Sequence, residues 1–346
     1  MFAREKSRLR TAGFFVFEEY PAEMTAKISE PRPDIIDQGN GVFAIDTGYL
    51  RPRMDASHLL VHRGRGAFVD TGTAHSVPLL LAALGRCGLS PADVEYVLLT
   101  HIHLDHAGGA GRLMHALPNA TLVVHPRGKR HMIDPTKLIA GSIAVYGEKM
   151  YRQLYGELLP IPEDRIRVVE DGEKLKLADR ELEFLHTPGH ALHHYCIVDR
   201  EADAIFSGDS FGVSYREFDT AAGAFIMPTT TPIHFDPEAA HASIDRLLSY
   251  QVSRMFLTHY SAVSSPEKLA RDLHADIDAF VEITHQHADS DDRHSAMVSA
   301  LYDYLGLRLD QHGCGLGQAE RHRLLDPDIE LNAQGLEYWL DRKTNG

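Results

Sequence analysis

The first half of the chain alternates short apolar segments with segments whose apolar positions recur at helical spacing. Short runs of branched and aromatic residues, several bounded by glycine turns, predict strands at 42–46, 58–62, 66–70, 94–100 and 121–125. Apolar residues spaced i, i+3, i+4 and i+7 predict helices at 77–84 and 110–117. This alternation favours an α/β fold.

A second strand-rich half follows a segment, 127–160, that has a helical composition. Its strands are predicted at 166–169, 174–177, 182–186, 195–198 and 204–207. A helix near 237–250 leads to a strand at 255–258, and the chain after Pro266 is predicted to be helical, with a polar break at 287–293. Because strands followed by helices occur twice, we expect two sheets packed together with helices outside.

Composition narrows the class of protein. With 346 residues, 44% hydrophobic and 24% charged, the chain has the balance of a folded globular protein of one large domain or two. Its formal net charge of −14 disfavours nucleic acid or an anionic membrane as the main partner. The three cysteines are widely spaced, which indicates neither a disulfide framework nor a Cys-x-x-Cys metal site.

The amino terminus resembles a targeting segment only loosely. Basic residues precede an apolar run at 12–17, but that run ends at Glu18 and is too short for an export signal. No stretch approaches the roughly 20 apolar residues of a membrane span. We therefore expect residues 1–30 to be a poorly ordered leader and the protein to be cytoplasmic.

A histidine motif follows the predicted strand at 94–100. It reads His101-Ile-His103-Leu-Asp105-His106 and precedes a glycine-rich helix start. Because side chains in extended chain alternate, His101 and His103 point to the same side. Imidazole and carboxylate groups at this spacing are typical ligands of a transition metal such as Zn²⁺. The alternative, a histidine-rich loop that binds nothing, is the weaker interpretation of so dense a motif.

The segment 100–109, THIHLDHAGG, resembles the signature of the metallo-β-lactamase superfamily. Further motifs of that superfamily follow in the expected order across residues 36–262: Asp70-Thr-Gly72, Thr187-Pro-Gly-His190, Ser207-Gly-Asp209 and Leu257-Thr-His259. The resemblance implies an αββα sandwich of two mixed sheets with helices outside, and the predicted elements agree with it. The helical tail lies outside the resemblance.

The same resemblance implies a dinuclear metal site. His101, His103 and His190 would hold one ion, Asp105, His106 and His259 the second, and Asp209 would bridge both. Zinc is the expected metal, although Fe²⁺ or Mn²⁺ accepts the same ligands. Asp70 is expected to orient a ligand histidine from behind. Taken singly, His190 could sit in a capped turn, Asp209 could end a strand, and His259 could be a core histidine.

The implied activity is hydrolysis by a hydroxide that bridges the two metals, with Asp105 accepting its proton. The bridging Asp209 resembles glyoxalase II-like thioesterases and lactonases and argues against a true β-lactamase. A small acyl substrate, a thioester, ester or lactone, is therefore the leading prediction. The alternatives are a phosphodiesterase and a non-catalytic metal-binding regulator, although the latter would not need every ligand position filled.

Substrate contacts and the tail are less constrained. His194 and Tyr215 are candidate substrate contacts, and the segments 135–160 and 211–235 are candidate pocket walls. We expect a catalytic domain at 31–264 and a helical extension at 265–346. The extension is expected either to cover the pocket or to form a contact in a homodimer. The expected partner is a small molecule.

Overall fold

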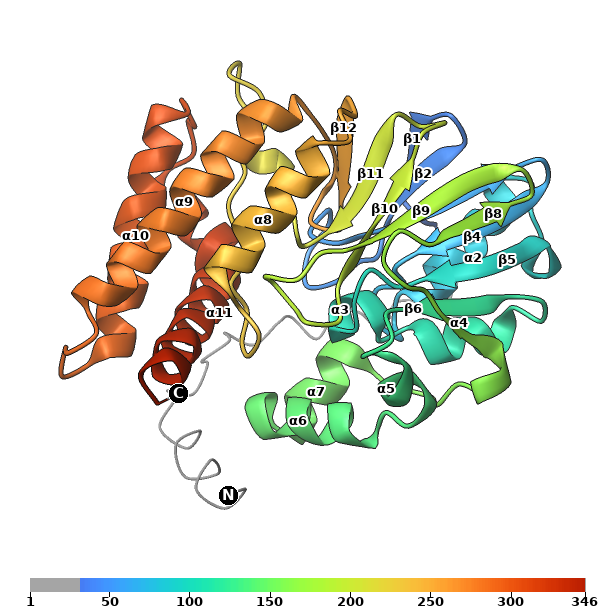
Figure 1. The fold of residues 1–346 in the computed structure, drawn as a ribbon, viewed down its shortest axis with the longest axis horizontal. Helices are drawn as coiled ribbons and strands as arrows, with labels where there is room; N and C mark the ends of the chain where they lie inside the picture. Colours follow the sequence, from blue (N-terminus) through green and yellow to red (C-terminus); the bar gives the residue numbers. More distant parts are fainter. Residues whose placement is uncertain (1–31, 346) are drawn as a thin grey trace.

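Two β-sheets packed face to face form the centre of the molecule, and helices cover both outer faces (Figure 1). The computed structural model describes residues 32–345. The leader predicted at 1–30 lies outside the described residues. The four layers are the αββα arrangement expected from the order of the predicted elements.

The first sheet contains seven strands that follow one another in chain order, from β1 at one edge to β7 at the other. The pairs from β1 to β4 are antiparallel, and those from β4 to β7 are parallel. Its strands are β1 (Ile35–Gly39), β2 (Val42–Asp46), β3 (Ala56–His62), β4 (Arg65–Val69), β5 (Val94–Leu98), β6 (Thr121–Val124) and β7 (Ile166–Val168).

The second sheet has the order β13-β12-β11-β10-β9-β8, and only the β11–β12 pair is parallel. Its strands are β8 (Lys174–Leu177), β9 (Arg180–His186), β10 (Tyr195–Asp199), β11 (Ala204–Gly208), β12 (Arg254–Leu257) and β13 (Ser261–Ser264). The edge strands β1 and β13 were not predicted. They are rich in polar or small residues, and only pairing with the neighbouring strand makes them extended.

Helices flank both sheets, and the helical segments predicted from the spacing of apolar residues are present. The described helices are α2 (Val77–Arg86), α3 (Leu104–Ala107), α4 (Ala110–Ala116), α5 (Lys129–Ile133), α6 (Thr136–Tyr146), α7 (Glu148–Tyr155), α8 (Pro237–Leu248), α9 (Pro266–Gln286), α10 (Arg293–Gln311) and α11 (Gln318–Asn345). Three short 3₁₀ turns occupy Pro91–Asp93, Glu163–Arg165 and Arg216–Phe218.

Consecutive residues of one strand serve different layers of the core. In β3, Leu59 packs in a cluster with α2 and α4, whereas Leu60 packs in the cluster between the sheets. In β12, Phe256 faces the other sheet, and its neighbour Met255 faces the C-terminal helices. Each sheet is buried on both faces, so residues on both sides of a central strand are apolar. This explains why the sequences of the central strands are nearly continuous apolar runs.

The C-terminal helices α9, α10 and α11 gather beside the second sheet (Figure 1). β13 ends at Ser264 and α9 begins at Pro266, where the sequence predicted that helix begins. One buried apolar cluster runs from Met255 of β12 through Leu273 and Leu301 to Ile329 of α11. The extension therefore shares a core with the second sheet.

Candidate metal centre

The histidine motif leaves the end of β5 and passes through the short helix α3. His101 follows the strand by three residues, and His103 is the residue before α3. His101 and His106 are fully buried, whereas His103 and Asp105 retain some exposure. The centre therefore opens toward solvent on the side of His103 and Asp105.

Three imidazoles form the first group of possible ligands. His101 Nε2 lies 2.8 Å from His103 Nδ1, and His103 Nδ1 lies 3.1 Å from His190 Nε2. His190 comes from the loop between β9 and β10, in the second sheet, so both halves of the fold supply nitrogens. Together these three residues form a cluster that could hold a metal ion.

A second group lies on the other side of His106. Asp105 Oδ2 lies 3.5 Å from His259 Nε2 and 3.8 Å from His106 Nε2. His259 follows β12, again in the second sheet. These three residues also form a cluster that could hold an ion.

Asp209, which follows β11, lies between the two groups. Its Oδ2 is 3.5 Å from His190 Nε2, whereas its Oδ1 is 3.3 Å from His106 Nε2 and 3.8 Å from His259 Nε2. The two carboxylate oxygens therefore face different groups, which is the placement that a bridging ligand requires. The structure thus brings together all seven residues that the sequence nominated as ligands.

Hydrogen bonds on the outer nitrogens of three rings leave the Nε2 atom of each directed into the centre. Three Nδ1 atoms face oxygens that can only accept, so each must carry its proton there, and Nε2 is free to bind a cation. The pairs are His106 with Asp70 Oδ2 at 2.8 Å, His190 with the Thr229 carbonyl at 3.3 Å, and His259 with the Met54 carbonyl at 3.0 Å.

Two buried atoms of the centre lack any hydrogen-bond partner among the described residues. They are His106 Nε2 and Asp209 Oδ1, which face each other. A buried polar atom without a partner is costly, and a cation would satisfy both. Nitrogen and carboxylate donors also match the preferences of Zn²⁺. The residues present therefore fit a divalent metal ion.

Electrostatics differ between the two groups. Burial and the neighbouring imidazoles hold the pKa of His101 well below its ordinary value, and burial lowers the pKa of His103 to about 3. Burial also disfavours charge on His106, but the carboxylates around it, led by Asp209, outweigh burial and hold its pKa well above its ordinary value. The pKa of His259 is likewise raised, to about 10. Without a metal, protons on these two rings balance the carboxylates, and a bound cation would replace them.

Asp70 forms hydrogen bonds with one candidate ligand, His106, and with residues next to two others. Its carboxylate accepts hydrogen bonds from His106 and from the backbone N–H of Thr100 at 2.8 Å, and also from the Thr100 hydroxyl. The hydroxyl of Thr258 donates to Asp70 Oδ2 at 2.9 Å. Thr258 was not singled out from the sequence, although a signal was present. The tripeptide Leu-Thr-His occurs twice, at 99–101 and 257–259, and in both cases its histidine is a candidate ligand.

Both ring nitrogens of His194, a candidate substrate contact, form hydrogen bonds within the protein. Its Nδ1 lies 2.9 Å from the Thr187 hydroxyl and 3.0 Å from the Ser210 hydroxyl, and its Nε2 accepts from the backbone N–H of Asp209 at 3.2 Å. Both ring nitrogens therefore help to hold the loop that carries Asp209. From this geometry we expect His194 to position Asp209 rather than to touch substrate.

The other candidate contact, Tyr215, is buried and points toward the C-terminal extension. Its hydroxyl donates to the carboxylate of Asp328, in α11, with distances of 2.9 and 3.1 Å. The guanidinium of Arg51 lies over its ring, 4.4 Å from the centroid. The hydroxyl is thus already paired with a side chain that the sequence could not connect to it.

The proposed pocket walls meet different parts of the molecule. Segment 135–160 forms α6 and α7, whose Tyr151 and Tyr155 pack on Leu104 of α3. Segment 211–235 lies under α11, where the side chain of Asn332 accepts from the backbone N–H of Thr230 at 2.6 Å. The extension therefore packs against this segment of its own chain.

Across residues 32–345, none of the helices combines the length and apolar character that crossing a membrane requires.

Comparison with known proteins agrees with this geometry. The profile of the metallo-beta-lactamase superfamily matches residues 50–259, which is more than half of the chain. A metallo-beta-lactamase fold-containing protein of Sulfurisphaera tokodaii is 28% identical over 231 residues, covering 65% of this chain and 80% of that protein.

Two relatives carry an activity in their names. The acyl-coenzyme A thioesterase MBLAC2 of Gallus gallus is 29% identical over 182 residues, covering 49% of this chain and 63% of its own length. The atrochrysone carboxyl ACP thioesterase of Aspergillus fumigatus is 24% identical over 216 residues, covering 58% of this chain and 54% of its own. This chain thus spans less than two thirds of either thioesterase.

Solved structures share the fold across most of the chain. A metallo-beta-lactamase family protein of Thermus thermophilus superposes with a TM-score of 0.64 at 20% identity, covering 89% of this chain and 95% of that one. A superfamily protein of Sulfolobus tokodaii superposes with a TM-score of 0.61 at 22% identity, covering 86% and 98%. At such identities the likeness concerns the fold alone.

Proposed function

The chain belongs to the metallo-beta-lactamase superfamily of metal-dependent hydrolases, and from that premise we propose that it hydrolyses a small acyl compound, foremost a thioester, using two divalent ions. The placement of Asp209 carries the proposal, because its two oxygens face two groups of ligands. Zinc is the proposed metal, since nitrogen and carboxylate donors suit it, although Fe²⁺ and Mn²⁺ accept the same donors.

Two observations support an acyl substrate. Two of the relatives are named as thioesterases, one for acyl-coenzyme A and one for an acyl carrier protein. The net charge of −14 disfavours binding of a polyanion such as nucleic acid. A thioester is therefore proposed ahead of an ester or a lactone, and a phosphodiester is the alternative.

The chemistry requires a proton acceptor beside the attacking water. Divalent ions at this centre would acidify water and polarise the acyl carbonyl. Asp105 lies on the open side of the centre and is the proposed acceptor because of that position. Nearby imidazoles, led by His106, outweigh burial and keep its pKa below its ordinary value, so its carboxylate is ionised. The water oxygen adds to the acyl carbon and the carbon–sulfur bond breaks. A carboxylic acid and a thiol are released, and the thiol sulfur takes up the proton.

A substrate panel tests the proposal. Metal-replete protein is assayed with acyl thioesters, esters, lactones and an activated phosphodiester, and thioesters are expected to give the highest kcat/KM. Asp105→Ala should lower kcat/KM by about 100- to 10,000-fold. Asp179→Ala, which changes an exposed aspartate between β8 and β9, is the matched control and should leave activity unchanged.

Three outcomes would contradict the proposal in different ways. Turnover of the phosphodiester alone would favour the alternative. Full metal content without turnover of any compound would favour a metal-binding regulator. Normal turnover by Asp105→Ala with both metals bound would exclude Asp105 as the proton acceptor.

A further inference from the structure

Two histidines, one on each of the helices α8 and α9, meet outside the candidate metal centre. His241 Nδ1 lies 2.6 Å from His274 Nδ1. His241 Nε2 lies 3.2 Å from Asp278 of α9, and His274 Nε2 lies 3.1 Å from Asp245 of α8. On each helix the histidine and the aspartate are four residues apart and share a face, and each aspartate pairs with the histidine of the opposite helix. We call His241 and His274 the interhelical histidine pair.

The two carboxylates determine which nitrogens of the pair carry protons. An ionised carboxylate only accepts hydrogen bonds, so both Nε2 atoms donate, and each neutral ring then has its lone pair on Nδ1. The ring centroids are 4.9 Å apart and the ring planes differ by 13°, so the rings meet edge to edge at their Nδ1 atoms. The two lone pairs therefore point at each other, and a cation between them would satisfy both nitrogens.

The surroundings of the pair suit a metal ion. A proton can lie between the nitrogens at acidic pH, whereas a transition metal binds the neutral rings at neutral pH. Metal-bound histidines commonly donate their other N–H to a carboxylate, as both rings do here. The side chains of His241 and His274 are 28% and 27% exposed, so water can fill the remaining coordination positions.

The distance between the two nitrogens is close to that in a metal site. Two nitrogens on one tetrahedral zinc ion lie about 3.3 Å apart, so the rings would separate by about 0.7 Å. Rotation of partly exposed side chains permits that change. Neighbouring nitrogens of the candidate metal centre are 2.8 and 3.1 Å apart, so both places require a similar small adjustment.

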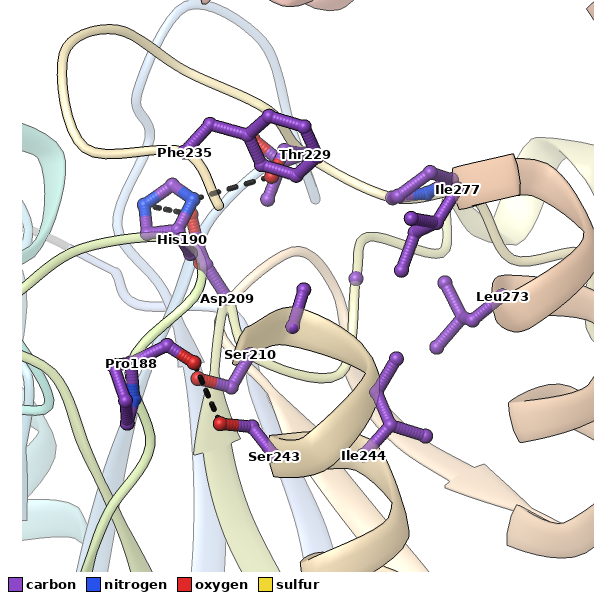
Figure 2. Close-up of a pocket in the computed structure, with 13 residues that line it drawn as sticks. Pro188, His190, Asp209, Ser210, Thr229, Phe235, Ser243, Ile244, Leu273 and Ile277 are labelled. Atoms are coloured by element: carbon purple, nitrogen blue, oxygen red, sulfur yellow. Dashed lines mark hydrogen bonds and ion pairs between the residues drawn. The ribbon is translucent and has the colours of Figure 1, made fainter. Parts of the chain in front are cut away.

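Helix α8 connects the pair to the loop that carries His190. Figure 2 shows Ser243 of α8 beside Pro188, two residues before His190, and the Ser243 hydroxyl donates to the Pro188 carbonyl at 2.6 Å. Ile244, the next residue of α8, packs in one apolar cluster with Leu273 of α9. An ion shared by α8 and α9 would therefore restrain the helix that contacts this loop.

We propose that the interhelical histidine pair binds one divalent transition-metal ion such as Zn²⁺, that Asp245 and Asp278 orient the rings, and that the ion restrains α8 against α9. The site is separate from the candidate metal centre and does not depend on the proposed function. It offers two protein ligands, whereas catalytic zinc sites have three. It should therefore bind more weakly, so that desalting removes this ion while the centre keeps its own.

A zinc titration tests the site. Metal-replete protein is desalted, and Zn²⁺ is titrated into the wild type, His241→Gln and His274→Gln in a calorimeter. The wild type should bind one ion per chain more than either variant. Asp278→Asn should lower the affinity for this ion by about 10- to 100-fold, because the ring of His241 loses its acceptor. His115→Gln, which changes an exposed histidine of α4, is the matched control and should bind zinc as the wild type does.

Hydrogen exchange tests the effect on α8. Zn²⁺ should slow amide exchange across 237–248 in the wild type but not in His274→Gln. Equal zinc stoichiometry in the wild type and both histidine variants would overturn the metal site. Binding of the extra ion without slower exchange in α8 would overturn the restraint on that helix. Neither measurement involves turnover, so failure of the proposed hydrolysis would leave both results unaffected.

Discussion

At the scale of single residues, Asp70 ties the metal centre to both sheets. It follows β4 with φ of +57° and accepts hydrogen bonds from Thr100, after β5, and from Thr258, after β12. It also accepts the Nδ1 proton of His106. One carboxylate therefore sets the tautomer of one ligand and anchors the residue before each of two others, His101 and His259.

Asp70→Asn tests this role. An amide presents N–H groups where the carboxylate accepted, so the Nδ1 proton of His106 loses part of its acceptor while the shape of the side chain is kept. We expect metal affinity to fall by roughly 10- to 100-fold. Titration against a competing chelator measures it, with Asp179→Asn as the control. Unchanged affinity at equal folded fraction would mean that Asp70 serves stability alone.

Tyr215→Phe tests whether this tyrosine contacts substrate or stabilises the fold through its hydrogen bond to Asp328. Since its hydroxyl donates to Asp328, whose pKa burial raises to about 6, we expect kcat/KM to change by less than about threefold. Unfolding free energy should fall by about 1–3 kcal/mol, because the carboxylate loses its donor. Tyr302→Phe, which removes a donor to the exposed Asp326, is the control. A 10- to 1000-fold loss of kcat/KM would instead restore the prediction that Tyr215 contacts substrate.

At the scale of elements, the C-terminal helices are joined by charged contacts as well as by the apolar cluster. His294, at the start of α10, lies 2.9 Å from both Glu330 and Glu337 of α11. The neighbouring Arg293 also reaches Glu337, at 3.0 Å. Hydrogen bonds to the two glutamates raise the pKa of His294 to about 10. The contact between α10 and α11 should therefore depend on pH.

His294→Gln tests this dependence. The folded pKa of about 10 exceeds the unfolded value of about 6.5, so the stabilisation is complete below pH 6.5 and is lost as pH rises to 10. We expect the variant to lower unfolding free energy by about 1 kcal/mol at pH 6, because the contact is partly exposed, and to match the wild type above pH 10. Urea unfolding at both pH values measures the difference, with His115→Gln of α4 as the control. A difference that is equal at the two pH values would contradict the assignment.

At the scale of the whole molecule, the candidate ligands come from both sheets. The motif at 101–106 follows the first sheet, whereas His190, Asp209 and His259 follow strands of the second. Ions bound here would add contacts between the halves that exist only in the folded state. Metal binding should therefore stabilise the whole fold.

Metal content and stability can be measured together. We expect metal-replete protein to contain two divalent ions per chain, and chelation to lower the unfolding temperature. Metal at 100 times its dissociation constant corresponds to about 2.7 kcal/mol per site. Because the pKa values of His106 and His259 are raised, protons compete with metal, so affinity should increase with pH. One ion or none by elemental analysis would exclude the dinuclear site.

The layered fold and the histidine motif at 101–106 could be predicted from the sequence because their signals are local, whereas the resemblance to the superfamily pointed to the other three ligands. Runs of branched residues and i, i+4 spacing depend on neighbours within one element, and the motif at 101–106 brings four of the seven candidate ligands within six residues. The other three, His190, Asp209 and His259, follow predicted strands. Strand ends and the loops beside them meet at one edge of a packed sheet, which is why residues far apart in the chain converge.

Only the tertiary structure decided which partners the remaining side chains have. Tyr215 meets Asp328 across 113 positions of the chain, and Thr230 meets Asn332 across 102. Nothing in either local sequence encodes these pairs. They exist because the apolar cluster of the second sheet is completed by α8 to α11. Local periodicity determines which elements form, whereas burial of their shared apolar faces determines what each polar group touches.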